Sequence, residues 1–314
     1  MKNIIYISIL LLLFSACQLS EKKTNKSKIY VEEAFEILQQ NIINEKGINL
    51  DSLKDNILSK IKSSTSQDSI HQLLRNGIRQ INKHSDLFNP SEFANKLESP
   101  EILEPRGKMI YNEIAYVTIP PCEAIDSLNS KKYTDSLRNN LTRLYNLNPK
   151  GWIIDLRNNI GGNMYAMIAG LGLFFGEGNL GYQIGQRENE WYFKRKNEFG
   201  EMEFIELADS YYEFKNKLPI VGLINGQTAS AAEAVTISLK CYPKSIIIGQ
   251  RTYGISTGNE MFFLSDSTCL NITTSIMADC EKNKYPNGIS PDVEIKEPLK
   301  LFKYAVSWIK ENEN

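Results

Sequence analysis

Two short runs of consecutive apolar residues constrain the fold of this 314-residue chain. One lies in "KGWIIDLRNN" (residues 150–159) and the other in "LPIVGLIN" (residues 218–225), and a glycine-containing turn and a helical pattern follow each. Strands that are apolar on both faces are typical of parallel sheets covered by helices on both sides. The alternation continues through "SIIIGQ" (residues 245–250) to an amphipathic segment at residues 299–310. We therefore expect an α/β domain with a largely parallel sheet.

The first part of the chain shows a different pattern. Between residues 29 and 97, Leu, Ile and Phe recur at helical spacing in three segments, with charged residues on the opposite face. The residues that then interrupt regular structure are Pro90, Pro100, Pro105 and Gly107. The sequence thus predicts a small N-terminal helical domain at residues 29–107 and the α/β domain at residues 108–314.

The N-terminus has the pattern of an export signal. A basic start, "MKN", precedes the 11-residue apolar run "IIYISILLLLF", whereas about 20 residues are needed to span a bilayer as a helix. The run ends in "FSAC", which resembles a bacterial lipoprotein signal with Cys17 as the lipidated residue, although Phe14 stands where Leu is usual. Simple secretion is the alternative. We expect residues 18–28 to be a flexible tether and the protein to be anchored by its lipid in the cell envelope, as a periplasmic or outer-surface lipoprotein.

Charge and cysteine usage restrict the partners. The 36 basic and 37 acidic side chains give a net charge of −1, so no nucleic-acid partner is expected. With two histidines and no CxxC motif, neither a metal nor another cofactor is expected. The four cysteines beyond Cys17 allow a disulfide in an oxidising compartment, but their pairing stays open. They are Cys122, Cys241, Cys269 and Cys280.

Ser230 has two interpretations. It follows an apolar strand and a tight turn and precedes a helix, with Glu233 three residues later, which is the pattern of a capping box. The same position suits a nucleophile, because the first amides of the helix point toward an oxyanion formed there. In the other turn, Gly161 and Gly162 are able to bring bare N–H groups close to a ligand. We interpret Asp155 and Arg157 as an ion pair that frames that turn.

Four ordered motifs connect these turns: "IIDLRNNIGG", "LINGQTASAAEAV", "IIIGQRTYGISTG" and "NGISPDVEI". Together they resemble the tail-specific, or C-terminal processing, serine peptidases over residues 108–298. The resemblance implies a crotonase-like spiral α/β core with Ser230 as the nucleophile. It also implies oxyanion donors at the amide of Ala231 and at Gly161 or Gly162.

The general base is not in its usual place. The processing peptidases use a lysine where this chain has Ile255, and isoleucine cannot accept a proton. The histidine-dependent, tricorn-like branch carries its base upstream, and "IRQINKHSDLF" places His84 in a similar context. His71 lies inside a predicted helix and is interpreted as a surface or packing residue. We therefore expect His84 to be the base.

Several other residues are candidates for roles in catalysis. The histidine-dependent branch has an acidic residue before its last strand, and Glu281, near Asp279, is our choice for the third catalytic residue. Ser85 is a further candidate to assist. Lys240 lies about 15 Å along the helix from Ser230, too far for proton transfer, and Lys244 is no better placed.

The sequence therefore predicts a serine endopeptidase that acts on exported polypeptides. The alternative is a catalytically degenerate, peptidase-like lipoprotein that binds polypeptide without cleaving it.

Overall fold

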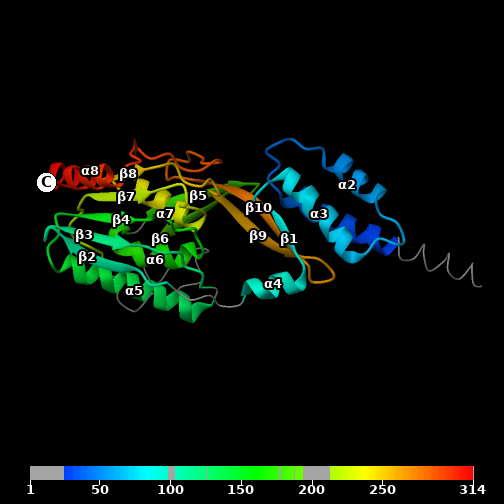
Figure 1. Ribbon diagram of the computed structural model, residues 1–314, viewed down its shortest axis with the longest axis horizontal. Helices are drawn as coiled ribbons and strands as arrows, with labels where there is room; N and C mark the ends of the chain where they lie inside the picture. Colours follow the sequence, from blue (N-terminus) through cyan, green and yellow to red (C-terminus); the bar gives the residue numbers. More distant parts are fainter. Residues whose placement is uncertain are drawn as a thin grey trace, which may run out of the picture. The chain divides into compact units, whose positions relative to one another are not determined.

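The computed structural model describes residues 25–97, 103–124, 126–176, 178–186, 188–193 and 213–313. These residues fall into two compact units, drawn with their elements in Figure 1. The first unit combines the chain up to Lys96 with Asn259–Thr274, and the second combines Leu97–Gly258 with Ser275–Asn314. The predicted signal and Cys17 lie outside the described residues. Within them, no helix is long and apolar enough to cross a bilayer.

The first unit is mainly helical, as predicted. Its elements are a helix at residues 25–41, α2 (Leu50–Ser59), α3 (Gln67–Ile81), β1 (Asp86–Phe88) and α4 (Pro90–Leu97). The predicted tether differs at its end, because residues 25–28 already form the first turn of a helix. Fully buried side chains of the helices, such as Leu38 and Leu74, form one core. The three predicted amphipathic segments thus bury their apolar faces against one another.

The domain boundary differs from the predicted one. We expected a continuous N-terminal domain ending near residue 107, but the units divide at Lys96–Leu97 and the first unit also includes residues 259–274. The physical reason is burial: Leu264, Leu270 and Ile272 belong to the core of the helical unit. Residues from the later hairpin are therefore part of the helical unit.

Helix α4 lies where we expected irregular structure. Pro90 is its first residue, where the missing N–H of proline costs nothing because the first helical amides have no intrahelical acceptor. Asn89 caps the helix: its side chain accepts from the Glu92 N–H at 2.9 Å, and the Glu92 carboxylate accepts from the Asn89 N–H at 3.0 Å. The Pro90 signal was thus a helix start and not a break.

A six-stranded sheet forms the centre of the second unit, with the order β11-β8-β7-β4-β3-β2. Its strands are β2 (Arg106–Ile110), β3 (Ile114–Thr118), β4 (Gly151–Asp155), β7 (Ile220–Ile224), β8 (Ser245–Gly249) and β11 (Val293–Glu294). All neighbours are parallel except β2 and β3, which form an antiparallel hairpin at the edge. The expected α/β fold with a largely parallel sheet is confirmed.

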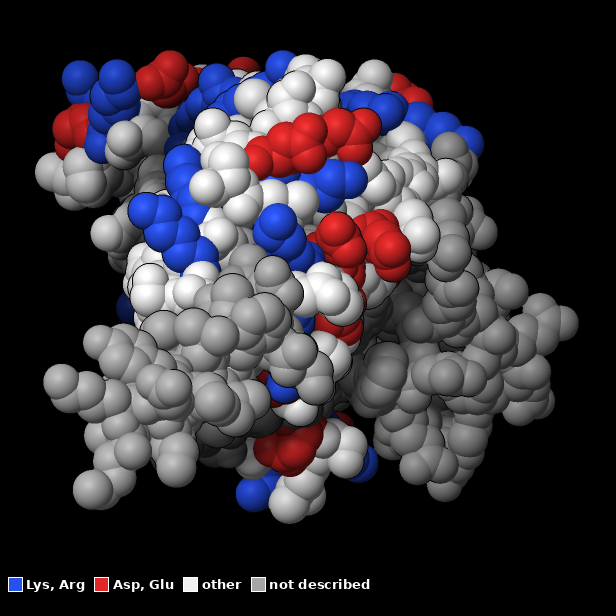
Figure 2. Space-filling model, turned by 90° about the vertical axis from the view of Figure 1, so that its right-hand side faces the viewer, with Lys and Arg blue, Asp and Glu red and all other residues white. Residues whose placement is uncertain are grey.

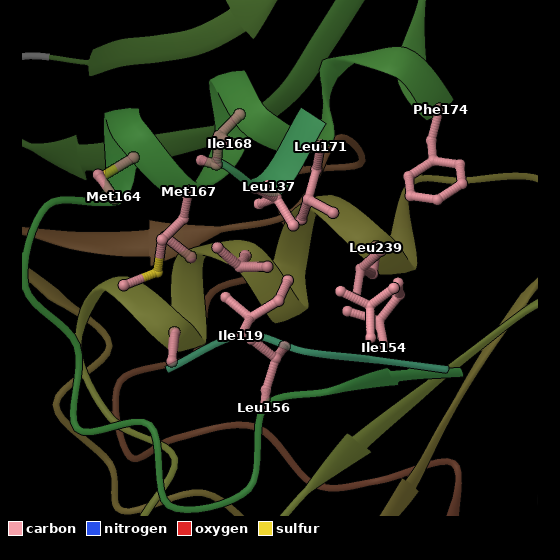
Figure 3. Packing of buried hydrophobic residues seen from close by; sticks show 14 of the residues in the cluster. Ile119, Leu137, Ile154, Leu156, Met164, Met167, Ile168, Leu171, Phe174 and Leu239 are labelled. Carbon is pink, nitrogen blue, oxygen red and sulfur yellow. The ribbon is translucent and has the colours of Figure 1, made fainter. Parts of the chain in front are cut away.

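Helices cover both faces of this sheet. They are α5 (Ser127–Tyr145), α6 (Met164–Phe175), α7 (Ala231–Lys240) and α8 (Pro298–Glu311). Alternate residues of β4 point to opposite faces: Trp152 and Ile154 pack with α5, α6 and α7, while Ile153 packs with α8. Figure 3 shows Leu137, Met167, Leu171 and other side chains interlocking in the larger core.

Helix α6 is apolar all round because it lies between other helices. Its residues from Ala166 to Phe174 are buried. Thr134 of α5 donates its hydroxyl to the Ala166 carbonyl at 3.1 Å, and Gly170 lies against Leu137 so closely that a Cβ there would overlap it. This core fixes the start of α6, and with it the turn between β4 and α6.

The remaining strands form a second, antiparallel sheet. They are β5 (Gly178–Gly185), β6 (Glu188–Phe193), β9 (Thr257–Phe263) and β10 (Cys269–Ala278), together with β1. In the first unit β10 pairs with β1, and in the second its last residues pair with β5. Strand β9 pairs with β10.

The cysteine pairing that the sequence left open is resolved. Cys241, at the end of α7, is bonded to Cys280, just after β10. Cys122 and Cys269 are buried and take part in no disulfide. The bridge joins the end of α7 to the turn that follows β10 within the second unit.

On one face of the molecule, charged groups of both signs are mixed (Figure 2). On the face shown in Figure 2, the described Lys and Arg side chains are interspersed with Asp and Glu. This agrees with the nearly equal numbers of basic and acidic residues in the sequence.

Candidate active site

Ser230 occupies a strained position at the strand-to-helix turn after β7. Its backbone has φ 54° and ψ −118°, a conformation that residues with a side chain rarely adopt. Such strain is maintained only where the surrounding structure enforces it, and it is concentrated at functional sites. The side chain is partly exposed, whereas Ala229 and Ala231 on either side are buried. The turn therefore presents one hydroxyl from an otherwise buried segment.

Hydrogen bonds fix this turn against the turn after β4. The Thr228 hydroxyl donates to the Leu156 carbonyl at 2.9 Å, and the Ala229 N–H donates to the Asn159 carbonyl at 2.9 Å. Both Thr228 and Asn159 are fully buried. Because β4 and β7 are parallel neighbours, their carboxyl ends place these two turns side by side.

The glycine turn lies directly against Ser230. Gly161 and Gly162 both have φ 109°. A Cβ on Gly161 would lie 2.8 Å from the Ser230 Cβ and 3.1 Å from the Ala231 nitrogen, and a Cβ on Gly162 would overlap the Cys122 carbonyl. Only glycine satisfies both the backbone conformation and this packing. The structure thus brings together three residues that the sequence predicted for the site: Ser230, Ala231 and Gly161.

The two glycine amides differ in their hydrogen bonding. The Gly161 N–H donates to the side-chain oxygen of Asn159 at 2.8 Å, in buried surroundings. Among the described residues, the amides of Gly162 and Ala231 donate no such hydrogen bond. Gly162 is exposed, while Gly161 is buried. The amides of Gly162 and Ala231 are therefore the ones available to an oxyanion.

Glu233 was predicted only as half of a capping box, and its role is wider. Its carboxylate accepts from the Ser230 N–H at 2.8 Å, from the Thr252 hydroxyl at 2.6 Å and from the Gly254 N–H at 3.1 Å. Complete burial raises the pKa of the Glu233 carboxyl, and these hydrogen bonds oppose the rise. Glu233 thus joins the turn that carries Ser230 to the turn at residues 252–255.

The Ser230 hydroxyl is not used as a firm helix cap. It lies near the Glu233 N–H, as in a capping box, but without a cap hydrogen bond of standard geometry. The Glu233 N–H donates to the Ser230 carbonyl oxygen at 2.8 Å instead. The predicted capping-box arrangement is thus present at this turn, but a cap alone does not require the strained backbone that Ser230 adopts.

The turn at residues 252–255 carries no proton acceptor in place of the family lysine. Ile255 is partly exposed, between the buried Gly254 and Ser256. Lys240 binds Asp292 at 2.6 Å at the other end of α7. The thiol of Cys122, whose backbone packs on Gly162, is no alternative nucleophile, because burial raises its pKa to about 11.

His84 belongs to the first unit, where its backbone is held on two sides. The His84 N–H donates to the Asn82 side chain at 2.9 Å, and the His84 carbonyl accepts from Asn259 at 3.1 Å. The neighbouring Ser85 is buried, and its hydroxyl accepts from the Thr273 N–H at 2.8 Å. Since Ser230 belongs to the second unit, the pairing of His84 with Ser230 stays a prediction, as does assistance by Ser85.

His71 is a packing residue, as interpreted from the sequence. It is buried in α3, and its Nε2 lies 3.0 Å from the Tyr30 hydroxyl and 3.3 Å from an Asp266 carboxylate oxygen. Both partners belong to the first unit. This leaves His84 as the histidine outside that network.

Glu281 and Asp279 occupy one turn after β10 and differ in environment. Glu281 is exposed. Asp279 is buried, and it accepts from the Tyr285 hydroxyl at 2.7 Å and from the Glu281 and Asn283 N–H groups at 3.0 Å. Burial acts against ionisation, but these donors outweigh it and lower the pKa of Asp279. Asp279 organises the turn, and the catalytic role of Glu281 stays a prediction.

Asp155 and Arg157 form the expected ion pair at the end of β4. The Arg157 guanidinium donates to both carboxylate oxygens of Asp155, at 2.8 and 2.6 Å, and Tyr116 donates to the same carboxylate. The pair fixes the start of the turn that leads to Gly161. Among the residues that the structure describes, no three His, Cys, Asp or Glu side chains are grouped as a metal site would require.

Comparisons with known proteins agree with this geometry. The model of "Peptidase family S41" matches residues 113–295. The nisin-resistance protein of Lactococcus lactis subsp. lactis is 27% identical over 73% of this chain and 69% of its own length. The carboxy-terminal-processing protease of Bartonella bacilliformis is also 27% identical, over 56% of this chain but only 35% of its own length. The chain thus spans about a third of that larger relative.

Solved structures give the same result. A lipoprotein from Streptococcus agalactiae superposes with a TM-score of 0.73 at 27% identity, over 91% of this chain and 96% of its own. The photosystem II D1 C-terminal processing protease superposes with a TM-score of 0.65 at 14% identity, over 86% of this chain and 92% of its own, which shows a shared fold. With a matching family model over more than half of its length, the chain belongs to peptidase family S41.

Proposed function

We propose that this protein is a serine endopeptidase of the cell envelope that hydrolyses peptide bonds of exported polypeptides. The observation that carries the proposal is Ser230: a serine in a strained, partly exposed turn that packs against Gly161. In the proposed location, lipidated Cys17 attaches the protein to the membrane. A relative named for resistance to nisin makes nisin one substrate to test.

The proposed chemistry is acyl transfer to Ser230. Its oxygen attacks the carbonyl carbon of the peptide bond while His84 accepts the hydroxyl proton. The carbonyl oxygen gains negative charge, which the N–H groups of Gly162 and Ala231 stabilise. The C–N bond then breaks as His84 donates the proton to the leaving nitrogen. Water then attacks the acyl carbon while His84 accepts a proton from it. The bond between the acyl carbon and the Ser230 oxygen breaks as His84 returns this proton to that oxygen.

Gly162 is the preferred second oxyanion donor in this scheme. Its supporting observation is that the Gly161 N–H is already bonded to Asn159. A donor that is bonded inside the protein would have to break that bond to stabilise the oxyanion. The Ala231 N–H at the start of α7 adds the favourable end of the helix dipole.

His84 is proposed as the base for two reasons: imidazole chemistry suits the role, and the other histidine, His71, is bonded elsewhere. The histidine side chain has an ordinary pKa of about 6.5 and is therefore suited to proton transfer near neutral pH. The imidazole of His71 lies among Tyr30, Asp266 and Thr268 in the first unit. Glu281 is the proposed third residue, which would orient the imidazole.

Labelling with a fluorophosphonate tests the proposal. We expect the intact protein to be labelled and Ser230→Ala to lose all label. His84→Ala should react at least about 100-fold more slowly, because a general base contributes that much to the rate. Ser290→Ala and Lys83→Ala, which alter exposed residues, are the matched controls and should react normally. Hydrolysis of an unstructured exported polypeptide should follow the same order.

The second candidate function, polypeptide binding without cleavage, has one specific observation in its favour. Ile255 replaces the lysine of the processing branch. If correctly folded protein takes up no label and binds an unstructured polypeptide equally well with and without Ser230, the binding function is correct and the peptidase proposal is wrong.

A further inference from the structure

Two large apolar side chains are exposed on the turns next to Ser230. Ile160 is 59% exposed and Tyr253 is 65% exposed. Isolated apolar residues on a protein surface are ordinary. These two differ because each belongs to a turn that packs on the segment carrying the nucleophile.

Ile160 directly precedes the glycine that contacts Ser230. The Gly161 Cα is so close that a Cβ there would lie 2.8 Å from the Ser230 Cβ. On its other side, Asn159 is fully buried, donates from its side chain to the Ile119 carbonyl at 2.9 Å and accepts from the Gly161 N–H. The backbone that carries Ile160 is therefore fixed on both sides of it.

Tyr253 lies on the other turn in contact with the nucleophile segment. Its N–H donates to the carbonyl of Thr228 at 2.9 Å, two residues before Ser230. The residues on either side, Thr252 and Gly254, are buried and both donate to the Glu233 carboxylate. Tyr253 is thus an exposed ring on a rigid backbone, like Ile160.

The folded unit itself does not explain this exposure. In each turn the neighbours are buried and make the structural hydrogen bonds, while the apolar side chain points to solvent. The arginines nearest in sequence are committed elsewhere: Arg157 to Asp155, and Arg251 to the Asn287 carbonyl at 2.8 Å. An incoming peptide would therefore meet apolar surface at these two positions.

We propose that Ile160 and Tyr253 are specificity-determining residues, which contact bulky apolar side chains of the substrate close to the bond that is cleaved. The proposal rests on the proposed peptidase function and names its substrate class. Rigidly held apolar side chains lose little conformational freedom when a ligand covers them, so burying them favours binding. Peptides with Leu or Phe next to the cleaved bond would be preferred over peptides with Ser or Asn there.

The test compares two peptides that differ only in the residues next to the cleaved bond. These residues are Leu and Phe in the apolar peptide, and Ser and Asn in the polar peptide. For the intact protein we expect a higher kcat/KM on the apolar peptide. Ile160→Thr and Tyr253→Ser should each lower the ratio of apolar to polar kcat/KM by about 10-fold, the discrimination that one lost apolar contact gives. Leu147→Ser removes an equally exposed apolar residue of the second unit and should leave the ratio unchanged.

Two further measurements separate this inference from the proposed function. Fluorophosphonate labelling of Ser230 should proceed at the same rate in the intact protein and in Leu147→Ser. If labelling is normal and the ratio does not change, the specificity inference is wrong and the peptidase proposal stands. If the intact protein neither labels nor cleaves, the peptidase proposal is wrong. Binding of the same two peptides to Ser230→Ala, measured by fluorescence anisotropy, then tests the specificity inference. Equal affinity for the apolar and the polar peptide would overturn it.

Discussion

At the scale of single residues, the site depends on positions where adding or replacing one side-chain atom would disturb the turn that carries Ser230. Gly161 has no room for a Cβ beside Ser230. Both carboxylate oxygens of Glu233 accept hydrogen bonds, one from the Ser230 N–H and the other from donors on the turn at residues 252–255. A buried carboxylate surrounded only by donors has no neutral substitute with the same hydrogen-bonding pattern. The conformation of Ser230 therefore depends on the charge state and shape of Glu233.

We predict that Glu233→Gln impairs both stability and reactivity. The amide would direct N–H groups toward at least one of its present donors, leaving a buried donor unsatisfied at a cost of about 1–3 kcal/mol. Urea unfolding measures this loss, and slower fluorophosphonate labelling at full folded fraction measures the displacement of Ser230. Glu123→Gln changes an exposed carboxyl of the same unit and serves as the control. Unchanged labelling in folded Glu233→Gln would show that Glu233 does not position Ser230.

At the scale of elements, the turn after β10 depends on Asp279. The carboxylate accepts four hydrogen bonds from within residues 281–285, and the Cys241–Cys280 bridge attaches the same turn to α7. The turn is thus stabilised by ionisation at one residue and by a covalent bond at the next. The first of these contributions depends on pH.

We predict that Asp279→Asn removes an acid-sensitive part of the stability. Because the folded pKa of Asp279 lies below its ordinary value of 3.8, the contribution is complete above that value and is lost as pH falls through the folded pKa. The difference in unfolding free energy between the intact protein and Asp279→Asn should be about 1–2 kcal/mol at pH 7 and shrink below pH 4. Glu281→Gln is the neighbouring exposed control. A difference that stays constant from pH 7 to pH 3 would contradict this.

The elements were largely predictable because most of them bury a continuous or periodic apolar pattern. Helix α6, at Met164–Phe175, coincides with the run "MYAMIAGLGLFF". The sequence failed where a local signal had two meanings, as at Pro90, which begins a helix instead of interrupting structure. In the site, Ser230 and the glycine turn were found from motifs, but the bonds from Glu233 to Thr252 and Gly254 link distant turns and follow only from the packing of the sheet.

At the scale of the whole molecule, the helical unit is discontinuous in sequence. It is completed by residues 259–274, which are separated from Lys96 by more than half of the chain. Leu87, Leu264, Leu270 and Ile272 share one core with the helices. No pattern in residues 29–107 predicts that part of the core of the helical unit comes from the distant β9–β10 hairpin. Because β9 and β10 contribute residues to both units, the core of the helical unit is complete only when these later strands are in place.

Leu270→Ala tests this discontinuity. Leu270 is fully buried, so truncation to alanine should cost about 2–5 kcal/mol. If residues 259–274 complete the helical unit, hydrogen exchange measured by mass spectrometry should accelerate in peptides from α3 as well as in β10, because α3 packs in the same core. Leu128→Ala, at a site 63% exposed in the second unit, should leave exchange in α3 unchanged. If exchange accelerates only in β10, the helical core is stable without residues 259–274. The helical unit would then not depend on the distant hairpin.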